Sequence, residues 1–164
     1  MPLDSSRTQS RRCERRISDR RSRDWAAGGD GLGITVDSNF IIDVLRLDPD
    51  ALAKSTELDG RADVKLLSTP VLYEITSGLL YTRSRSEASA FRALAARFAV
   101  LPFDEPAATK AAEIRAELMR LGRVKSHVDV MIGGVAASGG HALVTRDRDF
   151  ENIAPTVGLV LESY

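Results

Sequence analysis

Cysteine is almost absent from this 164-residue chain, which holds Cys13 and no other. One cysteine excludes an internal disulfide framework and a multi-cysteine zinc site, and it suits a reducing compartment. Long apolar runs are also missing: no segment approaches the roughly 20 apolar residues that cross a bilayer, and no apolar signal-peptide core follows the first charges. The sequence therefore predicts a cytoplasmic protein without a membrane segment.

Net charge is absent as well, because the 23 basic and 23 acidic residues cancel. The balance is uneven along the chain: residues 1–30 carry a net charge of +3 and residues 31–164 a net charge of −3. An acidic body lacks the broad basic face with which many proteins hold nucleic acid. Trp25, the single tryptophan, lies in the arginine-rich part and offers no clear base-stacking platform. Any contact of the body with RNA is expected to be local or metal-mediated.

Residues 1–33 contain few large apolar side chains and no regular apolar period. Such a segment cannot bury enough surface to offset the entropy of ordering, so we predict a disordered arginine-rich tail over 1–33. Two roles for it stay open: a basic arm that holds RNA phosphates, or an unstructured leader. Residues 34–164 are expected to form one compact domain.

From residue 34 onward, short runs rich in β-branched residues alternate with stretches of helical period, which predicts an α/β fold with a largely parallel sheet. Thr69 and Pro70 are interpreted as the N-cap and first-turn proline of a helix. The predicted strands cover 34–36, 64–68, 99–101, 142–145 and 157–161. The predicted helices cover about 39–46, 50–58, 70–81 and 126–138, with two more marked by the apolar faces Phe91, Leu94, Ala95, Phe98 and Ala107, Ala111, Ile114, Leu118, Leu121.

Four acidic residues fall at one predicted edge of this sheet, where open parallel sheets bind ligands. Asp37 follows the first strand, Asp147 follows the fourth, and Glu74 and Asp129 lie in early turns of helices beside strands two and four. Glu74 and Asp129 have apolar neighbours, where a carboxylate is costly unless it is paired or bound to metal. Converging carboxylates favour a hard cation such as Mg²⁺ or Mn²⁺. We therefore predict a metal site.

Each acid taken alone also has an ordinary structural explanation. Asp37 and Asp129 can each cap or begin a helix, and the helix dipole favours acids in the first turn. Asp104 also follows a strand, but the segment Asp104-Glu105-Pro106 is typical of a helix start, so it is left out of the site. Four acids at one edge together favour the metal site.

The four acids lie in four short motifs along the chain. The motifs are Val36-Asp37-Ser38-Asn39, Tyr73-Glu74-Ile75, Val128-Asp129-Val130-Met131-Ile132 and Leu143-Val144-Thr145-Arg146-Asp147-Arg148-Asp149-Phe150. They resemble the acidic motifs of PIN-domain ribonucleases, in the same order and at similar spacing. The most specific motif is a threonine followed two residues later by an acid and then by Asp-Phe. The resemblance covers about residues 34–162, and the compact length is most similar to the VapC toxins.

This resemblance implies a PIN-like three-layer fold, with helices flanking a mostly parallel central sheet. It also implies Mg²⁺- or Mn²⁺-dependent endonuclease cleavage of RNA by a homodimer that a small antitoxin protein inhibits. Asp37, Asp129 and Asp147 would be the metal ligands and Glu74 would complete the site. Gly133-Gly134 departs from the family pattern, where alanines are common, and is predicted to loosen its helix.

Neighbouring residues suggest auxiliary roles. Thr145 or Ser38 is expected to orient the attacking water, whereas Asp149 either binds metal or caps a turn. Arg146 and Arg148 either hold RNA phosphates or pair with nearby acids.

His127 and His141 lack a nucleophile partner pattern, so we interpret both as structural. No Gly-rich phosphate-binding motif occurs, which leaves nucleotide cofactors without support. Two other classes remain open. A Mg²⁺-dependent phosphatase or phosphotransferase would need an aspartyl nucleophile, which Glu74 and Asp129 fit poorly; the other class is a catalytically idle interaction protein.

The helix after Asp37 carries more apolar side chains than two turns can bury. Some of them are therefore expected to line a groove for an antitoxin segment. The six residues are Phe40, Ile41, Ile42, Val44, Leu45 and Leu47.

Overall fold

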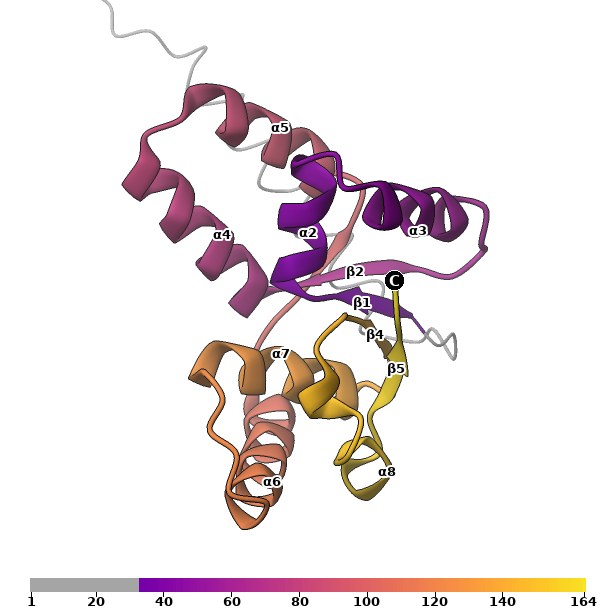
Figure 1. Ribbon diagram of the computed structural model, residues 1–164, viewed down its shortest axis with the longest axis vertical. Helices are drawn as coiled ribbons and strands as arrows, with labels where there is room; N and C mark the ends of the chain where they lie inside the picture. The colour runs from indigo at the N-terminus through magenta and orange to yellow at the C-terminus, as the bar shows by residue number, and fades with distance from the viewer. Residues whose placement is uncertain (1–32) are drawn as a thin grey trace, which may run out of the picture. The chain divides into compact units, whose positions relative to one another are not determined.

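A computed structural model describes residues 33–164 of the chain. Strands and helices alternate along this part, as Figure 1 shows. The strands are β1 (Ile34–Val36), β2 (Lys65–Ser68), β3 (Ala99–Leu101), β4 (Ala142–Val144) and β5 (Val160–Glu162). The helices are α2 (Ser38–Leu45), α3 (Pro49–Asp59), α4 (Thr69–Thr82), α5 (Arg85–Ala95), α6 (Glu105–Arg120), α7 (His127–Ser138), α8 (Ala154–Val157) and the 3₁₀ turn η1 (Arg148–Phe150).

All five strands run parallel in one sheet of order β3-β2-β1-β4-β5. The central strand is β1, in which Thr35 pairs with Leu66 of β2 on one side and with Leu143 of β4 on the other. Val36, Leu66 and Leu143 are completely buried, as expected of parallel strands that are covered on both faces. The core therefore lies along β1 and its two neighbours.

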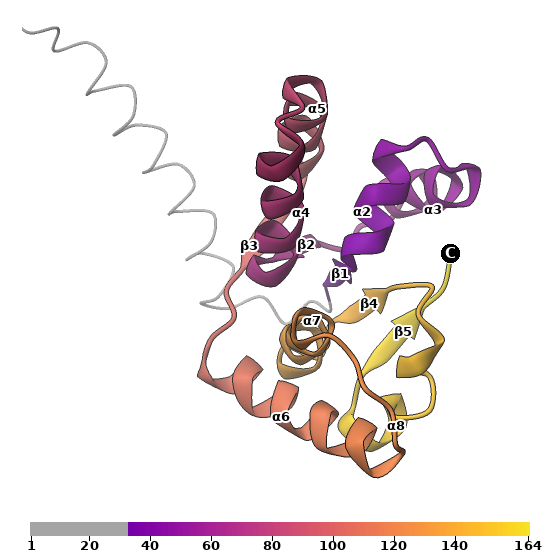
Figure 2. The same ribbon diagram turned by 60° about the vertical axis from the view of Figure 1, so that its left-hand side comes forward.

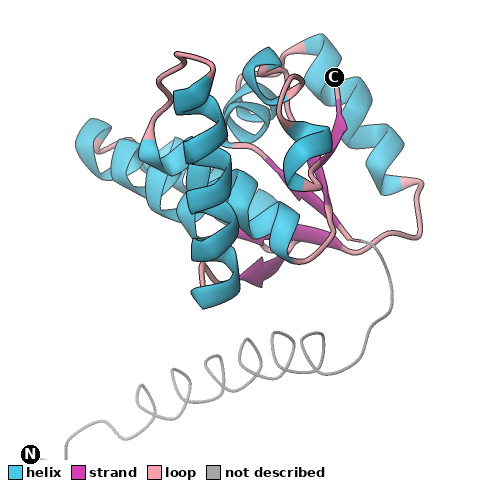
Figure 3. Ribbon diagram, turned by 90° about the horizontal axis from the view of Figure 1, so that it is seen from below, coloured by secondary structure: helices cyan, strands magenta, loops and turns pink. Residues whose placement is uncertain are grey.

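Helices cover both faces of this sheet. The chain moves from β1 to β2 and β3 in one direction, then returns to β4 and β5 beyond the other side of β1. Because crossovers between parallel strands are right-handed, this reversal places α2–α5 on one face and α6–α8 on the other. Figures 1 and 2 show the two groups on opposite sides of the strands, and Figure 3 shows the strands running between helices. The predicted three-layer α/β fold is confirmed.

The helices begin where side chains satisfy their free N–H groups. Asp104 Oδ1 accepts a hydrogen bond from Ala107 N–H at 3.1 Å, which confirms that Asp104 starts a helix. Ser126 Oγ accepts from Asp129 N–H at 3.1 Å and fixes the start of α7. The start of α4 is different from the prediction: Ser68 holds the N-cap position, and Thr69 Oγ1 instead accepts from Phe103 N–H at 2.9 Å.

Helices α6 and α7 pack closely because α7 carries two glycines on the facing side. A Cβ at Gly134 would lie 2.5 Å from the carbonyl oxygen of Ala107 and 2.7 Å from the Ala111 Cβ. A Cβ at Gly133 would lie 3.1 Å from both Ile114 and Phe150. The sequence prediction that the glycines loosen this helix therefore did not identify the main role of Gly134, which is to let α6 pack closely against α7.

Several boundaries differ from the sequence prediction, and three of the differences change where apolar residues lie. The apolar run 157–161 does not form one strand: Val157 ends α8, Gly158 turns the chain with φ of 70°, and β5 begins at Val160. Leu121 lies just past the end of α6 and is 52% exposed, so it is no part of the buried face. Phe98 likewise lies beyond α5, where it still packs against the core.

The predicted disordered tail falls almost entirely on residues 1–32, which lie outside the described residues, as do Cys13 and Trp25. Gly33, counted with the tail, is buried beside β1, and its N–H donates to His141 Nδ1 at 3.2 Å. Across residues 33–164, no helix is long and apolar enough to cross a membrane.

Candidate active site

Asp37 stands where the central strand β1 turns into α2. Its backbone is still extended, with φ of −78° and ψ of 159°, and its side chain caps the helix. Oδ1 accepts a hydrogen bond from Ser38 N–H at 2.6 Å. The backbone N–H of Asp37 donates to the carbonyl of Val144 at 3.1 Å, which joins this turn to the end of β4.

Thr145 connects Asp37 to Asp147. Its hydroxyl donates to Asp37 Oδ2 at 2.9 Å, and Thr145 Oγ1 in turn accepts from Asp147 N–H at 3.0 Å. Thr145 and Asp37 are each 4% exposed, so water does not compete for these bonds. The chain changes direction between β1 and β4, and open α/β sheets bind ligands at such a switch point. Two predicted site residues therefore meet at the expected edge.

The surroundings of Asp37 disfavour its charged form. Burial raises the pKa of Asp37, and hydrogen bonds from Thr145 and Ser38 oppose burial without cancelling it. The nearby charge of Asp129 also raises this pKa, whereas the charge of Lys125 lowers it. A nearby cation is what favours an ionised carboxylate in such a place.

Asp129, in the first turn of α7, faces the same edge. Its Oδ2 lies 3.8 Å from Lys125 Nζ. The same ammonium contacts the carboxylate of Asp147 and lies 3.8 Å from Asp149 Oδ2. Lys125 thus lies near three carboxylates, and Thr145 links one of them, Asp147, to Asp37. We call Asp37, Asp129, Asp147 and Asp149 together the acid cluster.

Lys125 is a site residue that sequence reasoning missed. Its side chain is only 7% exposed although it lies in the loop between α6 and α7. The sequence contains one signal, a lysine four residues before Asp129, but that spacing is common on helix surfaces and does not indicate burial.

Asp147, and not Asp149, caps the 3₁₀ turn that follows β4. Asp147 Oδ1 accepts from Asp149 N–H at 3.0 Å, so the interpretation of Asp149 as a turn cap is wrong. The Asp149 carboxylate instead pairs with Arg123 Nη1 at 2.8 Å. Its other predicted role, as an auxiliary metal ligand, stays a prediction.

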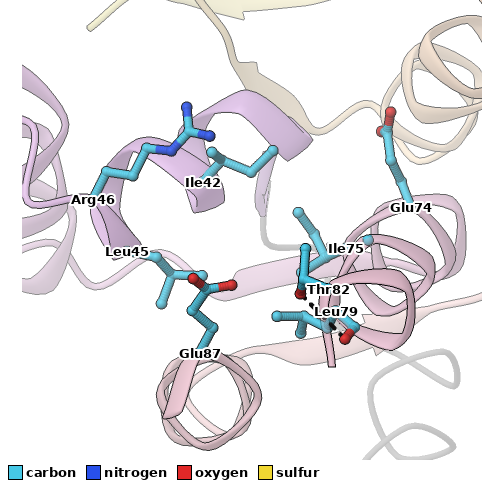
Figure 4. Close-up of a pocket in the computed structure, with 9 residues that line it drawn as sticks. Ile42, Leu45, Arg46, Glu74, Ile75, Leu79, Thr82 and Glu87 are labelled. Atoms are coloured by element: carbon cyan, nitrogen blue, oxygen red, sulfur yellow. Dashed lines mark hydrogen bonds between the residues drawn. The ribbon is translucent and has the colours of Figure 1, made fainter. Parts of the chain in front are cut away.

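Glu74 has a carboxylate oxygen without a partner. Its buried Oε2 accepts no hydrogen bond from residues 33–164. Glu74 lines a cavity of about 270 Å³ formed by side chains of α2, α4 and α5. Figure 4 shows its carboxylate pointing away from Leu79 and Glu87, which line another part of that cavity.

Two serines at the same sheet edge also have unused buried hydroxyls. Ser38, which follows Asp37, and Ser68, at the end of β2, each have a buried Oγ with no partner among the described residues. Buried polar atoms are usually satisfied, so these two hydroxyls are available to bind a water molecule or a polar ligand. Ser68 was not predicted, and its only signal was a polar residue between a buried strand and Pro70.

The two arginines beside Asp147 differ in their partners. Arg146 pairs with Asp43 at 3.4 Å and Asp48 at 3.2 Å, and its guanidinium lies 4.3 Å from the centre of the Tyr164 ring. The pairing interpretation therefore holds for Arg146. Arg148 is exposed and makes no ion pair with the described residues.

The histidines take no part in the acid cluster. His141 is buried, and its Nδ1 accepts a hydrogen bond from Gly33 N–H. Burial lowers the pKa of His141, which favours the neutral ring. His127 is exposed, and its Nε2 lies 3.4 Å from Arg115 Nη1. These contacts agree with the structural interpretation of His141 and give His127 no catalytic partner.

The donor types at this edge fit a hard cation, because carboxylate and hydroxyl oxygens are the ligands that Mg²⁺ and Mn²⁺ prefer. Their present arrangement is not that of a finished metal site: in residues 33–164, no group of three or more acidic, histidine or cysteine side chains is arranged to hold a metal ion. Lys125 Nζ is the cation that now lies among three of the carboxylates.

Asp37 and Asp147 meet where the order of the parallel strands reverses, which places the chain among open α/β proteins with a ligand site at the topological switch point. A family model described as PIN domain matches residues 34–155, and the chain belongs to the PIN domain family. The match includes Asp37, Glu74, Asp129 and Asp147.

Particular relatives are similar to parts or most of the chain. A tRNA(fMet)-specific endonuclease VapC of Shigella flexneri is 47% identical over 58 residues, which is 35% of this chain and 44% of that protein. The chain thus matches less than half of this curated relative.

Solved structures are similar over a longer part. DNA-bound VapBC of Salmonella typhimurium includes a chain with 29% identity and a TM-score of 0.67, over 80% of this chain and 98% of that one. VapBC2 of Rickettsia felis, bound to a promoter DNA fragment, includes one with 22% identity and a TM-score of 0.69, over the same shares. The second likeness shows the fold alone.

Proposed function

We propose that this chain is a divalent-metal-dependent endoribonuclease, the toxin of a toxin–antitoxin pair, that hydrolyses RNA phosphodiester bonds. One observation carries the proposal: Thr145 holds Asp37 and Asp147 together at the switch point, with Asp129 beside them. A stability role alone does not explain why other acids lie beside Asp37, where burial and the charge of Asp129 already oppose ionisation of Asp37. Membership of the PIN domain family and the VapC relatives support the same activity.

Asp37, Asp129 and Asp147 would hold Mg²⁺ or Mn²⁺ in this proposal. When bound, the ion would activate water as a nucleophile and neutralise charge on the phosphodiester. Thr145 would fix the positions of Asp37 and Asp147 rather than orient the water, because its proton is already directed at Asp37. Ser38 Oγ and Glu74 Oε2, buried and unpaired, would be the groups left to bind and orient the water.

The phosphatase alternative needs a free aspartyl nucleophile, and Asp37 fits that role poorly because both of its oxygens already accept hydrogen bonds. Exposed Arg148, close in sequence to Asp147, is a candidate for holding an RNA phosphate. RNA as substrate would place the activity in the cytoplasm.

The activity is tested with the purified full chain and a structured RNA in Mg²⁺, Mn²⁺ or a chelator. We expect cleavage that requires the metal and that falls by about 100-fold or more in Asp147→Asn. Lys110→Met, which removes an exposed pair with Glu113 on α6, is the control and should cleave as wild type does. Equal cleavage with chelator, or by Asp147→Asn, would contradict the proposal.

The cavity between α2, α4 and α5 is the proposed site of the antitoxin. Ile42 and Leu45 of α2 line it, as expected for some of the six apolar residues, whereas Phe40 and Ile41 are buried. Arg46 lies at its rim with Glu74 and Glu87, as Figure 4 shows. A short amphipathic helix with apolar anchors and a basic residue toward Glu87 would fit this lining.

Co-purification with the product of an adjacent reading frame tests the partner. Leu45→Glu should abolish binding and inhibition while leaving RNA cleavage unchanged, because Leu45 lies outside the acid cluster. Val160→Glu, which adds the same charge at an exposed apolar position on β5, is the control. Unimpaired inhibition of Leu45→Glu would place the partner elsewhere.

Homodimerisation remains part of the proposal. Tyr73, Leu80 and Tyr81 of α4 are 66%, 73% and 89% exposed and offer apolar area for a second copy. Sedimentation of the full chain measures the oligomeric state directly.

A further inference from the structure

Lys125 is the least exposed lysine in the ion pairs of the described residues. Its side chain is 7% exposed, whereas Lys54, Lys65 and Lys110 are 11%, 21% and 36% exposed. Its Nζ contacts Asp147 and lies 3.8 Å from oxygens of both Asp129 and Asp149. The ammonium also lies 5.0 Å from the centre of the buried Phe150 ring.

Burial of a lysine is costly unless carboxylates compensate its charge. The reverse also holds here, because Lys125 is the only ion-pair partner of Asp129 and Asp147 among the described residues, and these two carboxylates would repel each other without it. Asp149 differs, since it also pairs with Arg123 at 2.8 Å. The ammonium and the carboxylates of Asp129 and Asp147 therefore depend on each other. This distinguishes Lys125 from an ordinary surface ion pair, in which both charges remain hydrated.

Two of these carboxylates, those of Asp129 and Asp147, are the ones that would hold the divalent ion. An ammonium that contacts Asp147 cannot stay in place while the same oxygens bind a metal. The Asp149 carboxylate, 43% exposed and 3.8 Å from Nζ, offers the displaced ammonium a partner nearer the solvent. Lysine has a flexible four-carbon stem, so a shift of this kind needs no movement of the backbone.

We propose that Lys125 is an internal counter-cation that holds Asp129 and Asp147 together in the metal-free protein and competes with the divalent ion for them. This inference rests on the proposed metal-dependent function. Lys125 acts here as a positioning residue. Its ammonium keeps the acid cluster assembled without metal, and the same contacts lower the affinity for the metal.

The test measures Mn²⁺ binding to the full chain by calorimetry, without RNA. Lys125→Met removes the charge and keeps most of the buried stem, so Mn²⁺ should bind about tenfold more tightly or better, given the strength of a nearby positive charge. Lys125→Arg keeps the charge and should stay close to wild type. Lys110→Met is the matched control on an exposed pair and should also match wild type.

A second measurement uses the wild-type chain, so it does not depend on whether Lys125→Met folds. With ¹⁵N-labelled lysine, the buried Lys125 ammonium should give an exchange-protected NMR signal that is missing from Lys125→Arg. Saturating Mg²⁺ should remove or strongly shift this signal. A signal that is unchanged by Mg²⁺, or Mn²⁺ binding to folded Lys125→Met that is no tighter than to wild type, overturns the inference.

The two proposals fail in different ways. If wild type binds Mn²⁺ and cleaves RNA but Lys125→Met gains no affinity, the role of Lys125 is wrong and the nuclease stands. If wild type neither binds Mn²⁺ nor cleaves RNA, both proposals are wrong.

Discussion

Two groups of charged side chains in this protein differ in how their charges are balanced. The first group, which we call the α3–β5 network, consists of Lys54, Glu57, Arg61, Asp63 and Glu162. Each acid in it lies within 3.0 Å of a cation, as in the pairs Lys54–Glu162 at 2.9 Å and Arg61–Asp63 at 2.7 Å. In the second group, the acid cluster, Asp129 comes no closer than 3.8 Å to Lys125.

The difference indicates what each group does. Paired charges at a partly exposed position contribute modestly to stability and need no further ligand. The acid cluster has four carboxylates for two cations, Lys125 and Arg123, and Asp37 in it is only 4% exposed. This excess of negative charge supports the proposed cation site. The contrast between the two groups can be tested by removing one charge at a time.

The largest expected effect is on catalysis. Asp129→Asn keeps the shape of the side chain but removes a charge and a good metal ligand, so RNA cleavage should fall by about 100-fold or more. Without metal, the variant should be as stable as wild type or up to about 1–2 kcal/mol more stable, because repulsion in the acid cluster decreases. Cleavage assays and urea unfolding measure the two effects. Glu57→Gln, in the α3–β5 network, should cleave normally, and full activity of Asp129→Asn would remove the functional contrast.

The next effect concerns the link inside the acid cluster. Thr145→Val removes the hydroxyl that bonds both Asp37 and Asp147, which leaves two buried polar groups unpaired and should cost about 1–3 kcal/mol of unfolding free energy. Thr145→Ser should restore most of it. Thr56→Val is the control, since its hydroxyl makes an exposed bond to the Leu52 carbonyl. Urea unfolding compares the three, and equal stability of the two valine variants would contradict the proposed link.

A smaller effect separates the groups by their response to metal. Lys54→Met should cost about 0.5–1 kcal/mol, as for other partly exposed pairs, and Mg²⁺ should not restore this loss. Mg²⁺ should raise the melting temperature of wild type and of Lys54→Met equally, through binding to the folded acid cluster. Calorimetric melting with and without Mg²⁺ checks this. A wild-type chain whose melting ignores Mg²⁺ would show that the acid cluster does not bind the ion.

The smallest effect is a pH dependence in the α3–β5 network. Burial opposes ionisation of Glu162, but hydrogen bonds from Lys54 and Arg61 outweigh it and hold the pKa of Glu162 below its usual value. The stability that the ionised group contributes is therefore present above its unfolded pKa of about 4.3 and is lost as the pH falls through the lower folded value. Glu162→Gln should be less stable than wild type by about 1 kcal/mol or less at pH 7, and this gap should shrink below pH ~4. A gap that widens on acidification in urea titrations would contradict it.

Much of the fold could be predicted because its strands are short and apolar and its helices have clear starts. β1 and β3 were predicted to the residue, and Asp104 caps α6 as its sequence indicates. The prediction of one strand over 157–161 was wrong because hydrophobicity alone does not show that Gly158 turns the chain within this apolar run. The pattern of apolar residues predicts which side chains are buried, but it does not show where a turn ends an element.

The candidate site was predictable to the extent that strand ends share an edge. That rule brings Asp37 and Asp147 together, and the structure joins them through Thr145. It does not predict Lys125, because the burial of that side chain depends on how the loop after α6 folds over the acid cluster. Nor does it show that a carboxylate oxygen of Glu74 is buried without a hydrogen-bond partner.

The order of the strands has a consequence for how the protein is made. Asp37 lies near the start of the described domain, yet the hydroxyl that holds its carboxylate comes from a residue 108 positions later. During synthesis, β1 can pair with β2 long before β4 has emerged, so the nascent chain can begin its sheet without a complete acid cluster. Contacts so distant in sequence form late and slowly. With the proposed nuclease activity, a growing chain would therefore remain harmless to RNA until the segment that carries Thr145 and Asp147 has been added.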